Sequence, residues 1–108
     1  MISSPNMDER HYSKYFKAFG DPTRLRIIHL LSGNELTVNE IVGKIGLTQP
    51  TISRHLGILR DAEIVVDRRD GQRVFYSLNK KIVGSCCTDF CDCLEIPVQV
   101  IVGQNNKK

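Results

Sequence analysis

All four cysteines of this 108-residue chain lie within eight consecutive positions near its end. They are Cys86, Cys87, Cys91 and Cys93. Thiolates are soft ligands that select thiophilic ions, and neighbouring exposed thiols also oxidise readily. The cluster therefore predicts a site for a soft ion or a redox switch. A structural zinc site suits it less, because such sites usually pair two separated knuckles and eight contiguous residues would give a cramped cage.

Helix geometry limits how these thiols can share one ion. In a regular helix Cys87 and Cys91 would be neighbours, whereas Cys86 and Cys93 would lie roughly 10 Å apart along the axis. Sulfurs that bind one ion must come within about 4 Å of one another, given a metal–sulfur length of roughly 2.3 Å. The segment must therefore be non-helical, or it must distort on binding.

The composition is that of an ordinary globular domain, with 41% hydrophobic residues, 25% charged residues and a net charge of +3. The mild positive charge permits a polyanionic partner but does not demonstrate one. The chain does not start with a basic stretch followed by an apolar one, and it has no run of about 18 apolar residues. We therefore expect a cytoplasmic protein that does not contact a membrane, in which free thiols persist.

The length suits a single domain. Residues 1–7 have little to bury and are predicted to be disordered. Residues 8–103 are predicted to form the domain, with the cysteine-rich segment 86–93 as its sensor, and residues 104–108 a polar tail.

Helix signals recur through the first 62 residues. Aromatic residues at helical spacing indicate the first helix, and Asp21-Pro22 gives the second an N-cap followed by proline at the first helical position. Thr37 and Glu40 form a capping box, and Gly46 suits the left-handed position that ends a helix. The four predicted helices cover residues 8–19, 22 to Gly33, 37–45 and 48–62.

The pattern then changes to that of strands. Residues 64–66 and 74–78 are β-branched and aromatic, and Asp70-Gly71 between them is a dipeptide that tight hairpin turns prefer. The fold class is therefore mainly α with a small β-hairpin.

The end of the chain is ambiguous. Asn79 could cap a helix over residues 80–94, although Gly84 and several polar residues weaken that pattern. The apolar segment 96–102 could be a strand or could face a partner.

The two short helices 37–45 and 48–62 have the outline of a helix-turn-helix. The second would bury Ile52, Leu56 and Leu59 on one face. Its other face is small, polar and cationic, so it could enter a major groove, although a polar face that merely contacts water is the alternative. Three arginines near the hairpin turn suit phosphate oxygens and favour DNA binding. The candidate DNA-binding residues are Thr48, Gln49, Pro50, Thr51, Ser53, Arg54, His55, Arg68, Arg69 and Arg73.

Three stretches together resemble the ArsR/SmtB family of metal-responsive transcriptional repressors. They are AFGDPTRLRI from residue 18, QPTISRHL from residue 49 and RRDG from residue 68. The resemblance implies a homodimeric winged helix-turn-helix whose first and last helices form the dimer interface. It also implies that the protein binds double-stranded operator DNA when ligand-free and releases it when an ion binds. Residues 49–51, 53 and 54 would face the groove, with His55 less certain, and the arginines would serve the wing.

The resemblance also bears on the sensor. The family's Cys-x-Cys pair is absent from the helix before the turn, and no histidine follows Leu78 to provide its zinc site on the last helix. The terminal thiols are similar to the tri-cysteine site of arsenite-responsive members. This implies Cys86, Cys87 and Cys93 as ligands of As(III) or Sb(III), with Cys91 competing for the third place and no permanent cofactor. A thiol redox or persulfide sensor, or a cadmium-, lead- or zinc-responsive repressor, remains an alternative.

An enzyme is not expected. The sequence has no nucleophile elbow, phosphate-binding loop or telling pair of carboxylates, and no arginine follows the cysteines as a thiol-dependent arsenic reductase would need. His11, His29 and His55 are single histidines on predicted helices, so they are expected to be structural or close to DNA.

Overall fold

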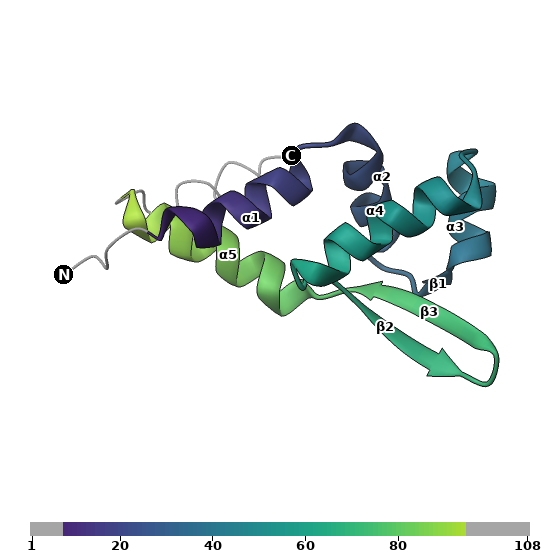
Figure 1. Ribbon diagram of the computed structural model, residues 1–108. Helices are drawn as coiled ribbons and strands as arrows, with labels where there is room; N and C mark the ends of the chain where they lie inside the picture. The colour runs from purple at the N-terminus through teal and green to yellow at the C-terminus, as the bar shows by residue number, and fades with distance from the viewer. Residues whose placement is uncertain (1–7, 95–108) are drawn as a thin grey trace, which may run out of the picture.

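The computed structural model describes residues 8–94, and the predictions made for residues 1–7, 96–102 and 104–108 lie outside them. Helices dominate the described part, and an antiparallel hairpin projects from it (Figure 1). We call this β2–β3 hairpin the wing. The elements are α1 (Glu9–Phe19), α2 (Pro22–Leu30), β1 (Leu36–Thr37), α3 (Val38–Ile45), α4 (Gln49–Asp61), β2 (Val65–Asp70), β3 (Arg73–Leu78) and α5 (Lys80–Cys93).

The predicted N-caps and the predicted end of α3 are confirmed, whereas α2 ends at Leu30, before the predicted Gly33. Asp8 and Asp21 cap α1 and α2 by accepting backbone N–H bonds from the first turn of each helix. The capping box of α3 is complete: the Thr37 N–H donates to Glu40 Oε1 at 2.8 Å, and the Glu40 N–H donates to Thr37 Oγ1 at 3.2 Å. Gly46 ends α3 with φ of 88°, a left-handed conformation that glycine adopts without strain.

The sheet has three strands in the order β1-β3-β2, all antiparallel. β1 was not predicted: it is two residues long and pairs Leu36 with Tyr76. Asp70 pairs with Arg73, so the two-residue turn is Gly71-Gln72, one position later than the predicted Asp70-Gly71. Gly71 has φ of 67° at the first turn position, where hairpins with this turn favour glycine.

The core joins the helices to the base of the sheet. Its fully buried side chains come mainly from α2, α3, α4 and the start of β2, and they include Ile27, Ile41, Ile52 and Val65. The wing extends beyond this core, whereas α1 and α5 pack side by side at the other end of the molecule (Figure 1).

The ambiguous end of the chain forms a regular helix. Asn79 caps α5 by accepting a bond from the Ile82 N–H at 3.3 Å. Phe90 packs against Tyr12 and Phe16 of α1, with ring centroids 5.3 and 4.8 Å apart. Among the described residues, no helix is long and apolar enough to cross a membrane.

Candidate nucleic-acid interface

Helix α4 separates its buried and exposed faces cleanly. Ile52, Leu56 and Leu59 are at most 1% exposed, which confirms the predicted core face. On the other side, the exposed residues of the first two turns are Gln49, Pro50, Ser53 and Arg54. Three of them carry amide, hydroxyl and guanidinium groups that can donate to phosphates or reach base edges in a major groove.

Two threonines close the N-terminal end of α4. Thr48 is the N-cap, and its Oγ1 accepts a bond from the Thr51 N–H at 3.4 Å. The two threonine hydroxyl oxygens lie 2.9 Å apart, so the two groups share a hydrogen bond. Thr51 is half-buried, and we therefore assign it a smaller part in the interface than the exposed neighbours.

His55, which was predicted as a candidate DNA contact, does not lie on the exposed face of α4. It is 7% exposed, and its Nδ1 lies 3.2 Å from Arg24 Nη1 and 3.9 Å from Asp21 Oδ2. We remove it from the candidate DNA contacts because its ring packs inside the protein, which agrees with the structural role also considered for it.

The three arginines of the wing have different surroundings. Arg68 donates to both carboxylate oxygens of Glu35, at 3.0 and 2.8 Å, and lies 3.9 Å from Asp70. The paired Glu35 carboxylate has a lowered pKa, because Arg68 bonds to it and stabilises its charge. Arg68 thus holds the wing to the segment before β1, and its charge is already balanced.

The other two arginines form no ion pair with a carboxylate of residues 8–94. Arg73 lies with Arg68 over the ring of Phe75, at 5.0 and 4.8 Å from the ring centroid. Arg69 pairs with Val74 and so projects from the opposite face of the wing. Arg69 and Arg73 are therefore better placed than Arg68 to meet phosphates.

An open groove of about 400 Å³ separates the start of α4 from the tip of the wing. Gln49 lines one side, and Gln72 and Arg73 line the other. Glu40 of α3 also lines it, and its pKa is lowered mainly by the Thr37 N–H bond and further by the charge of Arg73. The groove brings Gln49 of the predicted helix and Arg73 of the predicted wing to one concave surface.

The thiols of α5 are divided between different environments. Cys86 is 4% exposed in the core, Cys87 is exposed and Cys91 is half-buried. Burial raises the pKa of Cys86, and the nearby Cys87 and Asp89 add to the shift. Among the described residues, no group of three histidine, cysteine or acidic side chains could hold a metal ion together. The side chain of Cys93 lies outside the described part of the structure, so the predicted ligand set of Cys86, Cys87 and Cys93 stays a prediction.

Sequence reasoning missed two long-range contacts at this site. Glu35 bonds to Arg68, which is 33 positions away, and Arg24 contacts His55, which is 31 positions away. No local pattern signals such contacts, because they depend on how distant elements pack.

A helix-turn-helix with an arginine-bearing wing across a groove defines a winged-helix DNA-binding regulator. Residues 21–66 match the family described as bacterial regulatory protein, arsR family. The transcriptional repressor SdpR of Bacillus subtilis is 44% identical over 68 residues, which cover 63% of this chain and 76% of that repressor. The arsenic resistance transcriptional regulator ArsR1 of Pseudomonas putida is 46% identical over 68 residues, covering 62% of this chain and 53% of that regulator.

Solved structures agree with the sequence matches. HlyU from Vibrio cholerae superimposes with a TM-score of 0.67 at 30% identity, covering 76% of this chain and 90% of HlyU. The chain therefore belongs to the ArsR family and is a transcriptional repressor of that family.

Proposed function

We propose that this repressor binds a two-fold operator as a homodimer and leaves it when trivalent arsenic or antimony binds the thiols of α5. The observation that carries the DNA-binding part is the groove between the exposed start of α4 and Arg73 of the wing. A groove of this kind suits a duplex because α4 can enter the major groove while the wing meets the adjacent backbone. Operator binding by this chain then needs a second copy at a distance of one helical turn of DNA.

The apolar face of α1 and α5 supports the homodimer. Phe16 is 45% exposed although it packs on Phe90, and Leu94 at the end of α5 is 47% exposed. Exposed aromatic and aliphatic side chains on two helices that pack together favour a protein partner over water. A second copy would cover this face by an isologous contact, in which both chains use the same helices.

The chemistry of the thiols supports trivalent arsenic or antimony as the inducer. Trivalent arsenic and antimony prefer sulfur donors, and three thiolates would supply a complete ligand set. Cys86, Cys87 and Cys93 are the proposed ligands, and Cys91 competes for the third place.

Burial of Cys86 suggests how an inducer would change the dimer. Its side chain packs in the core beside α1, where the pKa of Tyr15 is raised mainly by burial and further by the charge that Cys86 would carry. To join the exposed Cys87 in one site, Cys86 must leave that position and α5 must lose its regular form. The α1–α5 packing would change with it, and the two α4 helices of the dimer would shift relative to each other. A useful switch needs a coupling of about 1–3 kcal/mol, and DNA must weaken inducer binding by the same factor.

The test is operator binding by fluorescence anisotropy with arsenite, antimonite, cadmium, lead, zinc, peroxide or persulfide added. We expect arsenite and antimonite to release the wild type and to leave the Cys86→Ser variant bound. Ser85→Ala, one position earlier on α5, serves as the matched control and should release normally. Arsenite release by Cys86→Ser would eliminate the proposed ligand set, and a wild-type response to oxidant alone would favour the redox sensor.

A further inference from the structure

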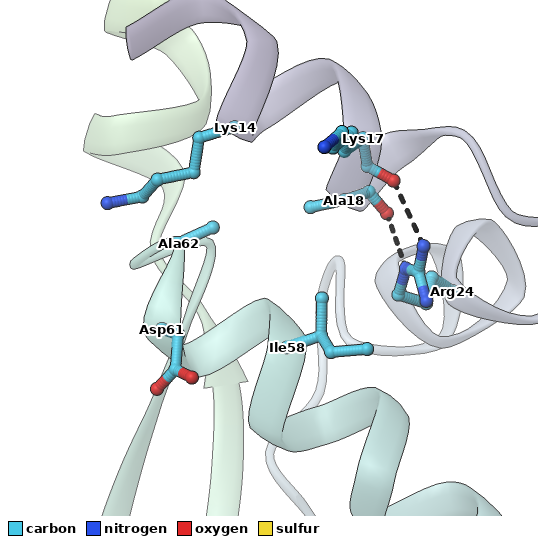
Figure 2. A pocket seen from close by; sticks show the side chains of 7 residues that line it. All are labelled: Lys14, Lys17, Ala18, Arg24, Ile58, Asp61 and Ala62. Carbon is cyan, nitrogen blue, oxygen red and sulfur yellow. Dashed lines mark hydrogen bonds between the residues drawn. The ribbon is translucent and has the colours of Figure 1, made fainter. Parts of the chain in front are cut away.

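The guanidinium of Arg24 joins two helices other than its own. Its Nε donates to the carbonyl oxygen of Ala18 at 2.8 Å, and its Nη2 donates to that of Lys17 at 3.0 Å. Both bonds are drawn in Figure 2, where Arg24 closes the end of α1. The last carbonyls of a helix carry partial negative charge, so a cation there is favourable. On its other side Nη1 lies 3.2 Å from Nδ1 of His55 on α4.

The chemistry of arginine fixes the state of His55. A guanidinium has only donors, so Nδ1 of the neutral ring must accept and Nε2 must carry the proton. The charged groups that face the ring are Asp21 and Arg24 of α2 and Arg54 of its own helix. Burial lowers the pKa of His55, Asp21 opposes that shift, and the two arginines reinforce it. The ring is therefore neutral at neutral pH, as the bond from Arg24 requires.

The position of His55 makes this contact relevant to DNA. Its neighbour in sequence, Arg54, is exposed on the face of α4 that we assign to DNA. A small rotation of α4 would move His55 away from Arg24 and would swing Arg54 by the same angle. A cavity of about 460 Å³ beside Arg24 is lined by Ala18 of α1 and Ile58 of α4 (Figure 2). Among the described residues, α1 and α4 make few other contacts.

We propose that Arg24 and His55 form a joint that fixes the rotation of α4 relative to α1, which makes Arg24 a positioning residue for operator binding. The joint would also carry a change in α5 to the DNA-binding helix, and this part of the proposal rests on the proposed function. Because α1 packs on the cysteine helix α5, a displacement of α1 would reach α4 through Arg24.

The first experiment compares two amides at position 55. Asparagine places its oxygen near the site of Nδ1 and can still accept from Arg24, whereas glutamine places it nearer the site of Nε2. We expect His55→Gln and Arg24→Lys to weaken operator binding about tenfold, as for loss of one bond to a charged group, and His55→Asn to remain within about threefold of the wild type. Arg26→Lys, an exposed position on the same helix, is the control for the loss of a guanidinium and should bind normally. Thermal melts identify the variants that are folded, and only those are compared.

The second experiment needs no variant. Nitrogen NMR of the His55 ring in the wild-type protein should show a protonated Nε2 and an unprotonated Nδ1. A protonated Nδ1 would overturn the proposal, as would equal operator affinities for folded His55→Asn and His55→Gln. Arsenite release is measured separately. If the wild type does not release, the proposed inducer fails, while the joint is still judged on operator affinity and the ring tautomer.

Discussion

Helices α4 and α5 are built alike but present their functional groups differently. They have 13 and 14 residues, and each begins at a polar N-cap, Thr48 and Asn79, that accepts a backbone bond from its first turn. On α4 the groups suited to DNA are on the outside, opposite an apolar face. On α5 the thiols are divided, with Cys86 in the core and Cys87 exposed.

The difference suits the roles that we propose for the two helices. A DNA-reading face works best when it is rigid and already formed, because ordering it on binding would cost affinity. A sensor can shift an equilibrium only if its ligand prefers one conformation over another. Divided thiols meet that condition, since a shared ion would favour an α5 that departs from the regular helix.

The largest effect expected from this comparison is on DNA affinity. Arg54→Ala removes an exposed cation from the formed face and should cost about 1–3 kcal/mol in operator binding. Arg26→Ala removes an exposed arginine of α2 outside the groove and should cost much less. Anisotropy titrations at one salt concentration measure both, and equal losses would remove Arg54 from the interface.

A second prediction concerns the division of the thiols. Cys87 should be alkylated at least about tenfold faster than Cys86, because the reactive thiolate must be accessible and burial raises the pKa of Cys86. Mass spectrometry of peptides after timed treatment with iodoacetamide measures both rates in one sample. Similar rates would mean that α5 opens readily, and the contrast with α4 would disappear.

The wing offers a third test, in the salt dependence of operator binding. Removal of one arginine that binds a phosphate should reduce the slope of log K against log salt by about 1. We expect this for Arg69→Ala and Arg73→Ala but a smaller change for Arg68→Ala, because Glu35 already balances that charge. Glu35→Gln should free Arg68 and make the slope steeper. A reduction by a full unit in Arg68→Ala would show that Arg68 leaves Glu35 for DNA.

The smallest expected effect is on stability against pH. The folded protein lowers the pKa of His55 below its ordinary 6.5, so the unfolded chain binds more protons as the pH falls through that region. Stability should therefore decrease below about pH 6.5 in the wild type. The lowered pKa values of Asp21 and Glu35 act in the same direction but in a more acidic range. Urea midpoints at several pH values should fall less steeply for His55→Asn, and parallel curves would contradict the assignment.

Local signals made most of the fold predictable. The caps at Asp21 and Thr37 and the left-handed Gly46 each act within a few residues, so the sequence alone located the starts of α2 and α3 and the end of α3. The hairpin was predicted one residue out of register, because Gly71 can occupy either central position of a two-residue turn. Strand β1 is too short to show a period.

The functional site was predictable only in part. The exposed side of α4 follows from helical periodicity, which identified Gln49, Ser53 and Arg54. Periodicity could not show that His55 meets Arg24 or that Arg68 meets Glu35, since these contacts arise from tertiary packing. It also could not show that Cys86 faces the core, because the whole of α5 was ambiguous.

Thr37 belongs to two elements at once. It pairs with Phe75 in the sheet, and its side chain caps α3. Thr37 thereby fastens the wing and the α3–α4 pair into a single block. The distance from Gln49 to the wing tip is therefore fixed within the chain. In the proposed homodimer, operators with differently spaced half-sites would then be accommodated by moving whole blocks past each other, and changes that alter spacing preference should map to α1 and α5 and spare the wing.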